Sequence, residues 1–215
     1  MTPPKARSKG GGALRAGARK ANLTRPGAGA TQAPQAPVWA WVLGTWFGSG
    51  WSPFGPGTAG TAASLPLAWV LGALLPEWNH WSPWCLAASL VLFYPAVLAA
   101  TRVEAALGIH DPGPVVVDET LGTLLTMAFL PAEAFHDWRA YAACFFLFRL
   151  LDVWKPGLIG RSQDLPRGWG IVVDDVLAGL VGGVILMAAW NRSWMALLVG
   201  LAPLLIANAI RVRKP

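Results

Sequence analysis

The chain has 215 residues, of which 54% are hydrophobic and only 13% charged, against about 25% charged in a typical soluble protein. Its mean hydropathy is +0.46, which indicates lipid around much of the fold. The net charge of +6 belongs to one appendage, because seven of the 17 basic residues and none of the 11 acids lie in residues 1–37. The rest of the chain lacks the basic surplus that a nucleic-acid-binding domain needs.

Residues 1–37 are rich in Gly, Ala and Pro and show no hydrophobic periodicity. We therefore expect a disordered basic tail ahead of a membrane-embedded domain formed by residues 38–215. The Arg-rich, acid-free composition resembles a transit peptide, and it equally suits a cytoplasmic tail attracted to anionic lipid. We favour the lipid-attracted tail because no amphipathic apolar face is visible. The first apolar run begins too late for a secretory signal.

From residue 38 onward, apolar runs alternate with short polar joints, which predicts an all-α polytopic membrane bundle. Most runs have about 13–17 residues, fewer than the about 20 of a perpendicular span, so some should enter partway or be lined by protein. We expect four to six short membrane helices, with six as the working model. The candidate segments are 62–76, 84–100, 118–131, 139–151, 176–190 and 194–210. Cys85 and Cys144 lie in apolar runs and should be small buried hydrophobes.

Charge placement supports a cytoplasmic tail. Six crossings then put loops 101–117 and 152–175 inside. Arg139 and Arg192 are the only basic residues left on the opposite side, in accordance with the positive-inside rule. Of the 13 tryptophans only Trp69 falls well inside a proposed span, as expected for interfacial indoles. The same topology gathers seven of the 11 acids at the cytoplasmic face. They are Asp111, Asp118, Glu119, Asp152, Asp164, Asp174 and Asp175.

The first acid cluster follows the Pro-Gly-Pro turn at 112–114. Asp118 and Glu119 open the helix after that turn. The helix dipole explains one acid there, whereas Mg²⁺, which prefers carboxylate oxygens and water, explains the pair. For this cluster alone the two interpretations are equally good. His110 should order the loop through a hydrogen bond rather than act in catalysis.

The second cluster consists of Arg149, Asp152 and Lys155, spaced three apart. One helical turn places them on the same side. They either form a stabilising ion-pair ladder, or Asp152 binds a metal while the two cations bind phosphate. The planar fork of arginine suits phosphate because it donates two parallel hydrogen bonds.

The third cluster is another acid pair, Asp174 and Asp175, which we expect to open the apolar helix 176–190. A repeated pair at the same membrane depth is difficult to attribute to helix capping. Glycines at 179, 182 and 183 should let helices approach closely. The Gly-rich stretch 48–61 precedes the first run, and its exposed N–H groups and hydroxyls suit a phosphate. No Lys follows its glycines as in a Walker loop, and a flexible entry turn is the simpler interpretation.

Together these elements resemble the phosphatidylglycerophosphatase A family over about residues 43–190. The matching strings are Gly48-Ser-Gly-x-x-Pro53 with Pro56-Gly-Thr-x-Gly60, Asp111-Pro with Asp118-Glu119-x-x-Gly122, Phe148-Arg149-x-x-Asp152-x-x-Lys155-Pro156, and Gly168-x-Gly170 with Asp174-Asp175-x-x-Ala178-Gly179. This chain differs in Thr61, where Ser is usual, and in its basic tail. The resemblance implies Mg²⁺-dependent hydrolysis of phosphatidylglycerophosphate to phosphatidylglycerol and phosphate, a step of phospholipid biosynthesis. It implies a multi-pass enzyme of the inner (cytoplasmic) membrane with its active site facing the cytoplasm.

On this interpretation five acids bind metal and carry out catalysis: Asp118, Glu119, Asp152, Asp174 and Asp175. Arg149 and Lys155 bind the substrate phosphate, helped by Gly57 and Thr58. Which acid serves as general base stays open, and a covalent aspartyl-phosphate is an alternative. The expected partners are the lipid substrate and the membrane, without nucleic acid, and the sequence predicts no oligomeric state.

The main alternative is a membrane transporter with an acid-lined ion path, although such acids usually lie near the bilayer midplane and here they flank the apolar runs. A scaffold protein needs fewer polar motifs than the four present. A CDP-alcohol phosphotransferase would carry spaced Asp-Gly pairs that this sequence lacks, and a histidine-based lipid phosphatase would carry a catalytic His motif.

Overall fold

The computed structural model describes residues 35–73 and 82–192, and within these ranges every regular element is a helix. The predicted all-α class is thereby confirmed for this part of the chain. Most of the predicted tail and the predicted segment 194–210 lie outside the described residues. The elements are α1 (Val38–Gly44), η1 (Ser49–Trp51), α2 (Pro56–Ala73), α3 (Pro83–Leu107), α4 (Val117–Ala128), η2 (Ala132–His136), α5 (Trp138–Trp154), α6 (Leu158–Ser162) and α7 (Gly168–Trp190).

Local sequence signals account for where α3 and α5 begin and end. The Ser82 hydroxyl accepts a hydrogen bond from the Cys85 N–H at the start of α3, and Gly108 ends that helix in the left-handed region with φ 65°. The Asp137 carboxylate accepts a bond from the Arg139 N–H at the start of α5. Such caps satisfy backbone groups that a helix end leaves free. Because α3 continues to Gly108, much of the predicted loop 101–117 is helical.

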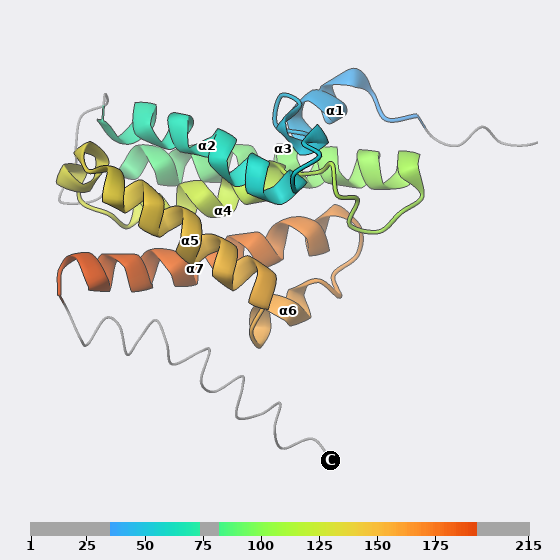
Figure 1. The fold of residues 1–215 in the computed structure, drawn as a ribbon. Coiled ribbons are helices and arrows are strands. Elements are labelled where there is room, and N and C mark those ends of the chain that lie inside the picture. The colour runs from blue at the N-terminus through green and yellow to red at the C-terminus, as the bar shows by residue number, and fades with distance from the viewer. Residues whose placement is uncertain (1–34, 74–81, 193–215) are drawn as a thin grey trace, which may run out of the picture. The chain divides into compact units, whose positions relative to one another are not determined.

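The helix α4 is the centre of the bundle, in contact with α2, α3, α5 and α7 (Figure 1). All 12 of its residues are buried. At 1.5 Å per residue it is about 18 Å long, well short of the about 30 Å hydrocarbon core of a bilayer. The predicted membrane segment 118–131 is therefore a short helix enclosed by other helices rather than a span in contact with lipid.

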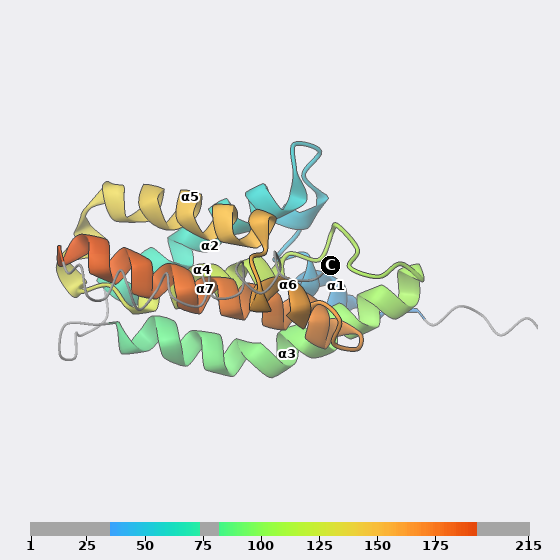
Figure 2. The same ribbon diagram turned by 90° about the horizontal axis from the view of Figure 1, so that it is seen from below.

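Two helices in the described ranges, α3 and α7, are long and apolar enough to cross a membrane, judged by length and composition. They have 25 and 23 residues, and α7 is the more buried of the two inside the bundle. In Figure 2 both run along the same direction as α5. The expectation of four to six spans is thus supported for two helices, and the higher number stays a prediction.

Glycines let α4 and α7 pack backbone against backbone. A Cβ on Gly179 would collide with the backbone of Gly122, and a Cβ on Gly183 would collide with the Phe129 ring. The Thr126 hydroxyl lies 2.8 Å from the carbonyl oxygen of Gly122 and 3.3 Å from that of Gly179, so it links the two helices. The close approach predicted for these glycines is confirmed.

The ends of several helices meet on one side of the bundle. The first residues of α2, α4 and α7 lie there, together with the last residues of α5 (Figures 1 and 2). The N–H of Val116 donates to the Gly44 carbonyl oxygen at 2.7 Å, and Gly60 packs so tightly on Val116 that a Cβ would not fit. The Gly-rich entry segment is therefore a packed turn that fixes the start of α2 beside the start of α4.

Candidate active site

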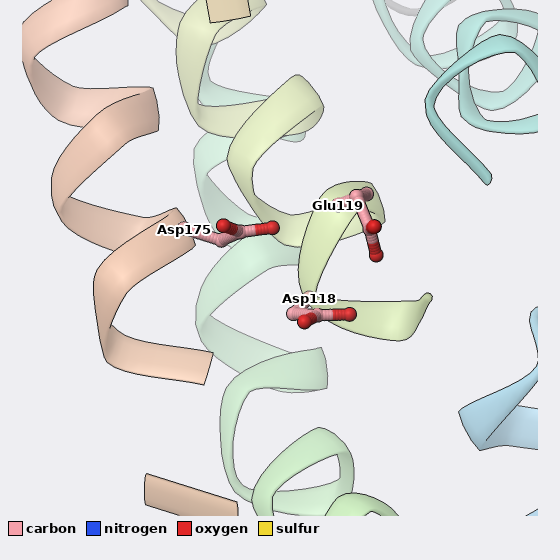
Figure 3. Close-up of side chains that lie close together, drawn as sticks. All are labelled: Asp118, Glu119 and Asp175. Carbon is pink, nitrogen blue, oxygen red and sulfur yellow. The ribbon is translucent and has the colours of Figure 1, made fainter. Parts of the chain in front are cut away.

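Three carboxylates from two helices come together at this end. Asp118 and Glu119 occupy the first turn of α4, as predicted, and Asp175 reaches toward them from α7 (Figure 3). One oxygen from each lies within 4.8 Å of the others. All three residues are buried, with exposed fractions of 7%, 8% and 2%. The convergence of the first and third acid clusters is thereby observed.

The acid pair on α7 does not lie where the sequence predicted. We expected Asp174 and Asp175 to open a helix at 176, but α7 begins at Gly168, about two turns earlier. Gly168 and Gly170 belong to the helix because each lies against backbone from another segment, where a Cβ would collide. The helix dipole acts within the first turn, so capping cannot account for these two acids.

Several carboxylate oxygens in this cluster are buried without a hydrogen-bond partner among the described residues. They are Asp118 Oδ1, Glu119 Oε2 and Asp174 Oδ1. A buried charge without compensation is costly, and a native structure rarely leaves such groups unsatisfied. Closely spaced carboxylates are the ligand set that Mg²⁺ prefers. The donor set therefore fits a hard divalent cation.

The acids of α4 have perturbed ionisation. Burial, reinforced by repulsion from Glu119 and Asp175, raises the pKa of Asp118 well above its ordinary value. Burial also raises the pKa of Glu119 to about 7, although hydrogen bonding to Asp118 and the charge of Arg149 act in the opposite direction. Both shifts show that negative charge is unfavourable here in the metal-free protein.

Two cations from the end of α5 border the acids. The Nη1 atom of Arg149 lies 2.5 Å from Oδ2 of Asp152 and 3.7 Å from Oε1 of Glu119. The Nζ atom of Lys155 lies 2.5 Å from Oδ2 of Asp174 and 3.7 Å from Oδ1 of Asp152. The predicted placement of Arg149, Asp152 and Lys155 on one side of a helical turn is confirmed. These pairs also connect α5 to α4 and α7.

Lys155 ends α5 in the left-handed region, with φ 46°. Burial alone would lower the pKa of its amine, but the hydrogen bond that the amine donates to Asp174 and the charges of the nearby acids raise this pKa above its ordinary value. The amine is therefore protonated at neutral pH. It places a fixed positive charge between the acids of α5 and those of α7.

A cavity of about 200 Å³ opens between these groups, and Gly57 forms part of its wall. A Cβ at position 57 would collide with the side chains of Glu119 and Arg149, so glycine keeps this wall clear. Thr58 is exposed and does not line the cavity. Its phosphate-binding role, like that of Gly57, stays a prediction.

Asp111 also lines the cavity, although we had assigned it no role from the sequence. It adopts a left-handed conformation with φ 49°, which Asp tolerates better than most residues. The signal that could have indicated it is its position directly before the Pro-Gly-Pro turn. Its neighbour His110 has Nδ1 2.7 Å from Glu104 Oε1, in agreement with the expected loop-ordering hydrogen bond.

The fold and the site define a helical protein whose buried carboxylates and flanking cations can hold a divalent cation and an anionic group in one cavity. The family model for phosphatidylglycerophosphatase A matches residues 42–190. The chain belongs to the phosphatidylglycerophosphatase A family and is a phosphatase.

Three relatives resemble most of the folded part. Phosphatidylglycerophosphatase A of Escherichia coli K12 is 37% identical over 146 residues, which cover 67% of this chain and 80% of that protein. A putative phosphatidylinositol-3-phosphatase of Bacteroides thetaiotaomicron is 39% identical over 150 residues, which cover 69% of this chain and 91% of that protein. Phosphatidylglycerophosphatase A of Haemophilus influenzae is 32% identical over 155 residues, which cover 72% of this chain and 89% of that protein. No solved structure matches the chain significantly.

Proposed function

We propose that this phosphatase hydrolyses phosphatidylglycerophosphate to phosphatidylglycerol and phosphate, with Mg²⁺, at the cytoplasmic face of the inner membrane. The names of two relatives support the substrate. One structural observation supports the chemistry: three buried carboxylates converge beside two cations in a single cavity. A phosphomonoester dianion would be repelled by those acids unless a cation offset their charge.

We assign the Mg²⁺ to Asp118, Glu119 and Asp175. When bound, the ion would offset the charge of the acids and of the phosphate and would lower the pKa of a bound water. Asp152 and Asp174, also predicted as ligands, make their short contacts to Arg149 and Lys155. Their role in the proposal is to hold these two cations in place.

The remaining polar groups of the cavity suit the terminal phosphate of the lipid. Arg149 presents a planar fork that donates to phosphate oxygens, and its contact to Glu119 places it beside the proposed metal ligands. Lys155 adds a point charge on the same side of the cavity. The missing side chain at Gly57 leaves room for the phosphate beside Glu119 and Arg149.

The arrangement of α3 and α7 supports this placement in the membrane. Both candidate spans pack against the enclosed α4, and the acid cavity is lined by residues of the first turns of α2 and α4 and of the last turn of α5. A lipid phosphate lies at the corresponding depth, the boundary between hydrocarbon and water. The surplus of basic residues in the tail and in the predicted cytoplasmic loops supports a position of this cavity on the cytoplasmic side.

A direct assay tests this function. Purified full-length protein in detergent should release phosphate from phosphatidylglycerophosphate, lose the activity with a chelator and regain it on addition of Mg²⁺. Phosphatidic acid, which lacks the second phosphate, serves as the comparison substrate. Activity that persists after metal removal would contradict the role of Mg²⁺. Ion flux in proteoliposomes without phosphate release from this lipid would support the transporter interpretation instead.

Protons should compete with the metal near neutral pH. Burial raises the pKa of Glu119 to about 7, and only the ionised carboxylate binds Mg²⁺, so metal binding displaces a proton below that pH. We expect the apparent Kd for Mg²⁺ to rise at least about tenfold for each unit by which the pH falls below 7, because the raised pKa of Asp118 lets a second proton compete with the metal. Titration calorimetry at pH 6, 7 and 8 measures this. An affinity that is constant over this range would contradict ligation by Glu119.

A further inference from the structure

A second cavity, of about 300 Å³, adjoins the acid cavity and has no role so far. It lies between the end of α5 and the short helix α6, and its wall includes Trp154, Lys155, Arg161, Gln163 and Asp164. Most of these side chains are polar or charged. A cavity of this kind is suited to a hydrophilic ligand rather than to an acyl chain.

Lys155 lines both cavities. The chain turns sharply after it, because Lys155 and Gly157 both have positive φ. Gly160 then lies so close that a Cβ would be 2.7 Å from the Lys155 carbonyl oxygen. This tight turn holds α6 against the end of α5 and fixes the second cavity next to the first. Because Lys155 lines both, the two cavities lie on either side of one side chain.

Arg161 gives the second cavity an available positive charge. Its side chain is exposed, and no carboxylate of the described ranges lies within ion-pair distance of it. Lys155, in contrast, is already paired with Asp174. A guanidinium without a partner in a polar cavity suits a phosphate group, to which it donates two parallel hydrogen bonds. Gln163 and Asp164 add groups that can hydrogen-bond a hydroxyl.

We propose that the second cavity binds the phosphodiester and glycerol part of the lipid head group, with Arg161 on the phosphodiester. This inference rests on the proposed function, in which the substrate carries two phosphates joined by a three-carbon glycerol. The terminal phosphate occupies the acid cavity, and the glycerol hydroxyl faces Gln163 and Asp164. Trp154, whose large apolar side chain is exposed, lines the second cavity, and the exposed Leu158 is the first residue of α6. They suit the start of the acyl chains.

The consequence is that Arg161 determines specificity without taking part in the reaction. For Arg161→Gln we expect the KM for phosphatidylglycerophosphate to rise about tenfold, the worth of one hydrogen bond to a charged group, while kcat stays within about twofold. Arg161→Lys, which keeps the charge, should recover part of the loss. Arg102→Gln removes an exposed arginine of α3 that lines neither cavity and should leave both parameters unchanged.

Two soluble competitive inhibitors separate the cavities. Glycerophosphoglycerol carries only a phosphodiester, and its inhibition constant should rise about tenfold in Arg161→Gln, like the KM. Inorganic phosphate should bind in the acid cavity, and its inhibition constant should be the same in Arg161→Gln as in the wild type. An active Arg161→Gln enzyme with wild-type KM, or one in which both inhibitors weaken equally, would overturn the inference alone. A wild-type protein inactive on the lipid would overturn the proposed function, and this inference with it.

Discussion

Replacing Asp175 by Asn should lower kcat by about a thousandfold, because a bound metal contributes several kcal/mol to a transition state that carries negative charge. The substitution keeps the size of the side chain and removes one of the three converging carboxylates. Mg²⁺ titration calorimetry should show weaker binding in the same variant. Phosphate release from the lipid at saturating substrate gives kcat.

Although Asp175→Asn should lose activity, its metal-free form should not lose stability. Asp175 is 2% exposed and lies beside two other acids, so without metal its charge opposes the packing of α7 on α4. We expect the Tm of metal-free Asp175→Asn to equal or exceed that of the wild type. The Mg²⁺-dependent rise in Tm, which follows from binding to the folded state, should be lost. A metal-free Tm well below that of the wild type would show that Asp175 is needed for folding rather than for the ion.

Asp174→Asn is the matched comparison, since it alters the adjacent residue of the same helix. Asp174 contacts Lys155 at 2.5 Å and is not part of the converging group of three. We expect its variant to keep the Mg²⁺ affinity within about tenfold, the lower range for residues that support metal ligands, and to bind the lipid less well. Equal loss of Mg²⁺ binding in both variants would return Asp174 to the set of ligands.

Gly179→Ala should destabilise the bundle and inactivate the enzyme together. The new methyl group would meet the carbonyl oxygen and Cα of Gly122, which are backbone atoms that cannot rotate away. Forcing extra atoms into a packed core costs about 1–3 kcal/mol, and here the displacement separates the helices that carry Asp118 and Asp175. Thermal unfolding in detergent and phosphate release measure the two effects.

Gly182→Ala controls for the general effect of alanine in a helix. It lies in the same helix and gains the same helix propensity, about 1 kcal/mol. Its Cβ would approach the Thr126 hydroxyl at 3.3 Å and Leu151 at 3.5 Å, and both are side chains that can move slightly. We expect Gly182→Ala to retain wild-type activity within a few fold and a Tm close to that of the wild type. If both variants lose activity equally, the contact of Gly179 with Gly122 is not what assembles the site.

The part of the site that depends on local spacing could be predicted from the sequence. Arg149, Asp152 and Lys155 are three apart, and a helical turn brings such residues together in any fold that makes them helical. The first-turn position of Asp118 and Glu119 followed from the turn before them. For such residues the sequence contains all the geometry that is needed.

Features that depend on packing could not be predicted in this way. Gly168 and Gly170 have the composition of a loop, and only the neighbouring backbone explains why they begin α7. The apolar run of α4 has the composition of a membrane segment, yet it is buried by four other helices. Asp111 enters the cavity through the course of a loop, and Thr58 stays outside it, although both belong to conspicuous motifs. Spacing along the sequence does not encode any of these features, because each depends on how the folded segments pack.

The central position of α4 has a consequence during translation. The ribosome synthesises this short helix, with its two acids in the first turn, before it synthesises α7. The hydrogen bond from the Thr126 hydroxyl to the Gly179 carbonyl oxygen joins residues that are 53 positions apart. Until the last described helix emerges, a nascent chain can therefore pack α4 only against the earlier helices α2 and α3 and then against α5. The three acids meet only then, so a chain released before α7 is complete has neither a closed core nor a catalytic centre.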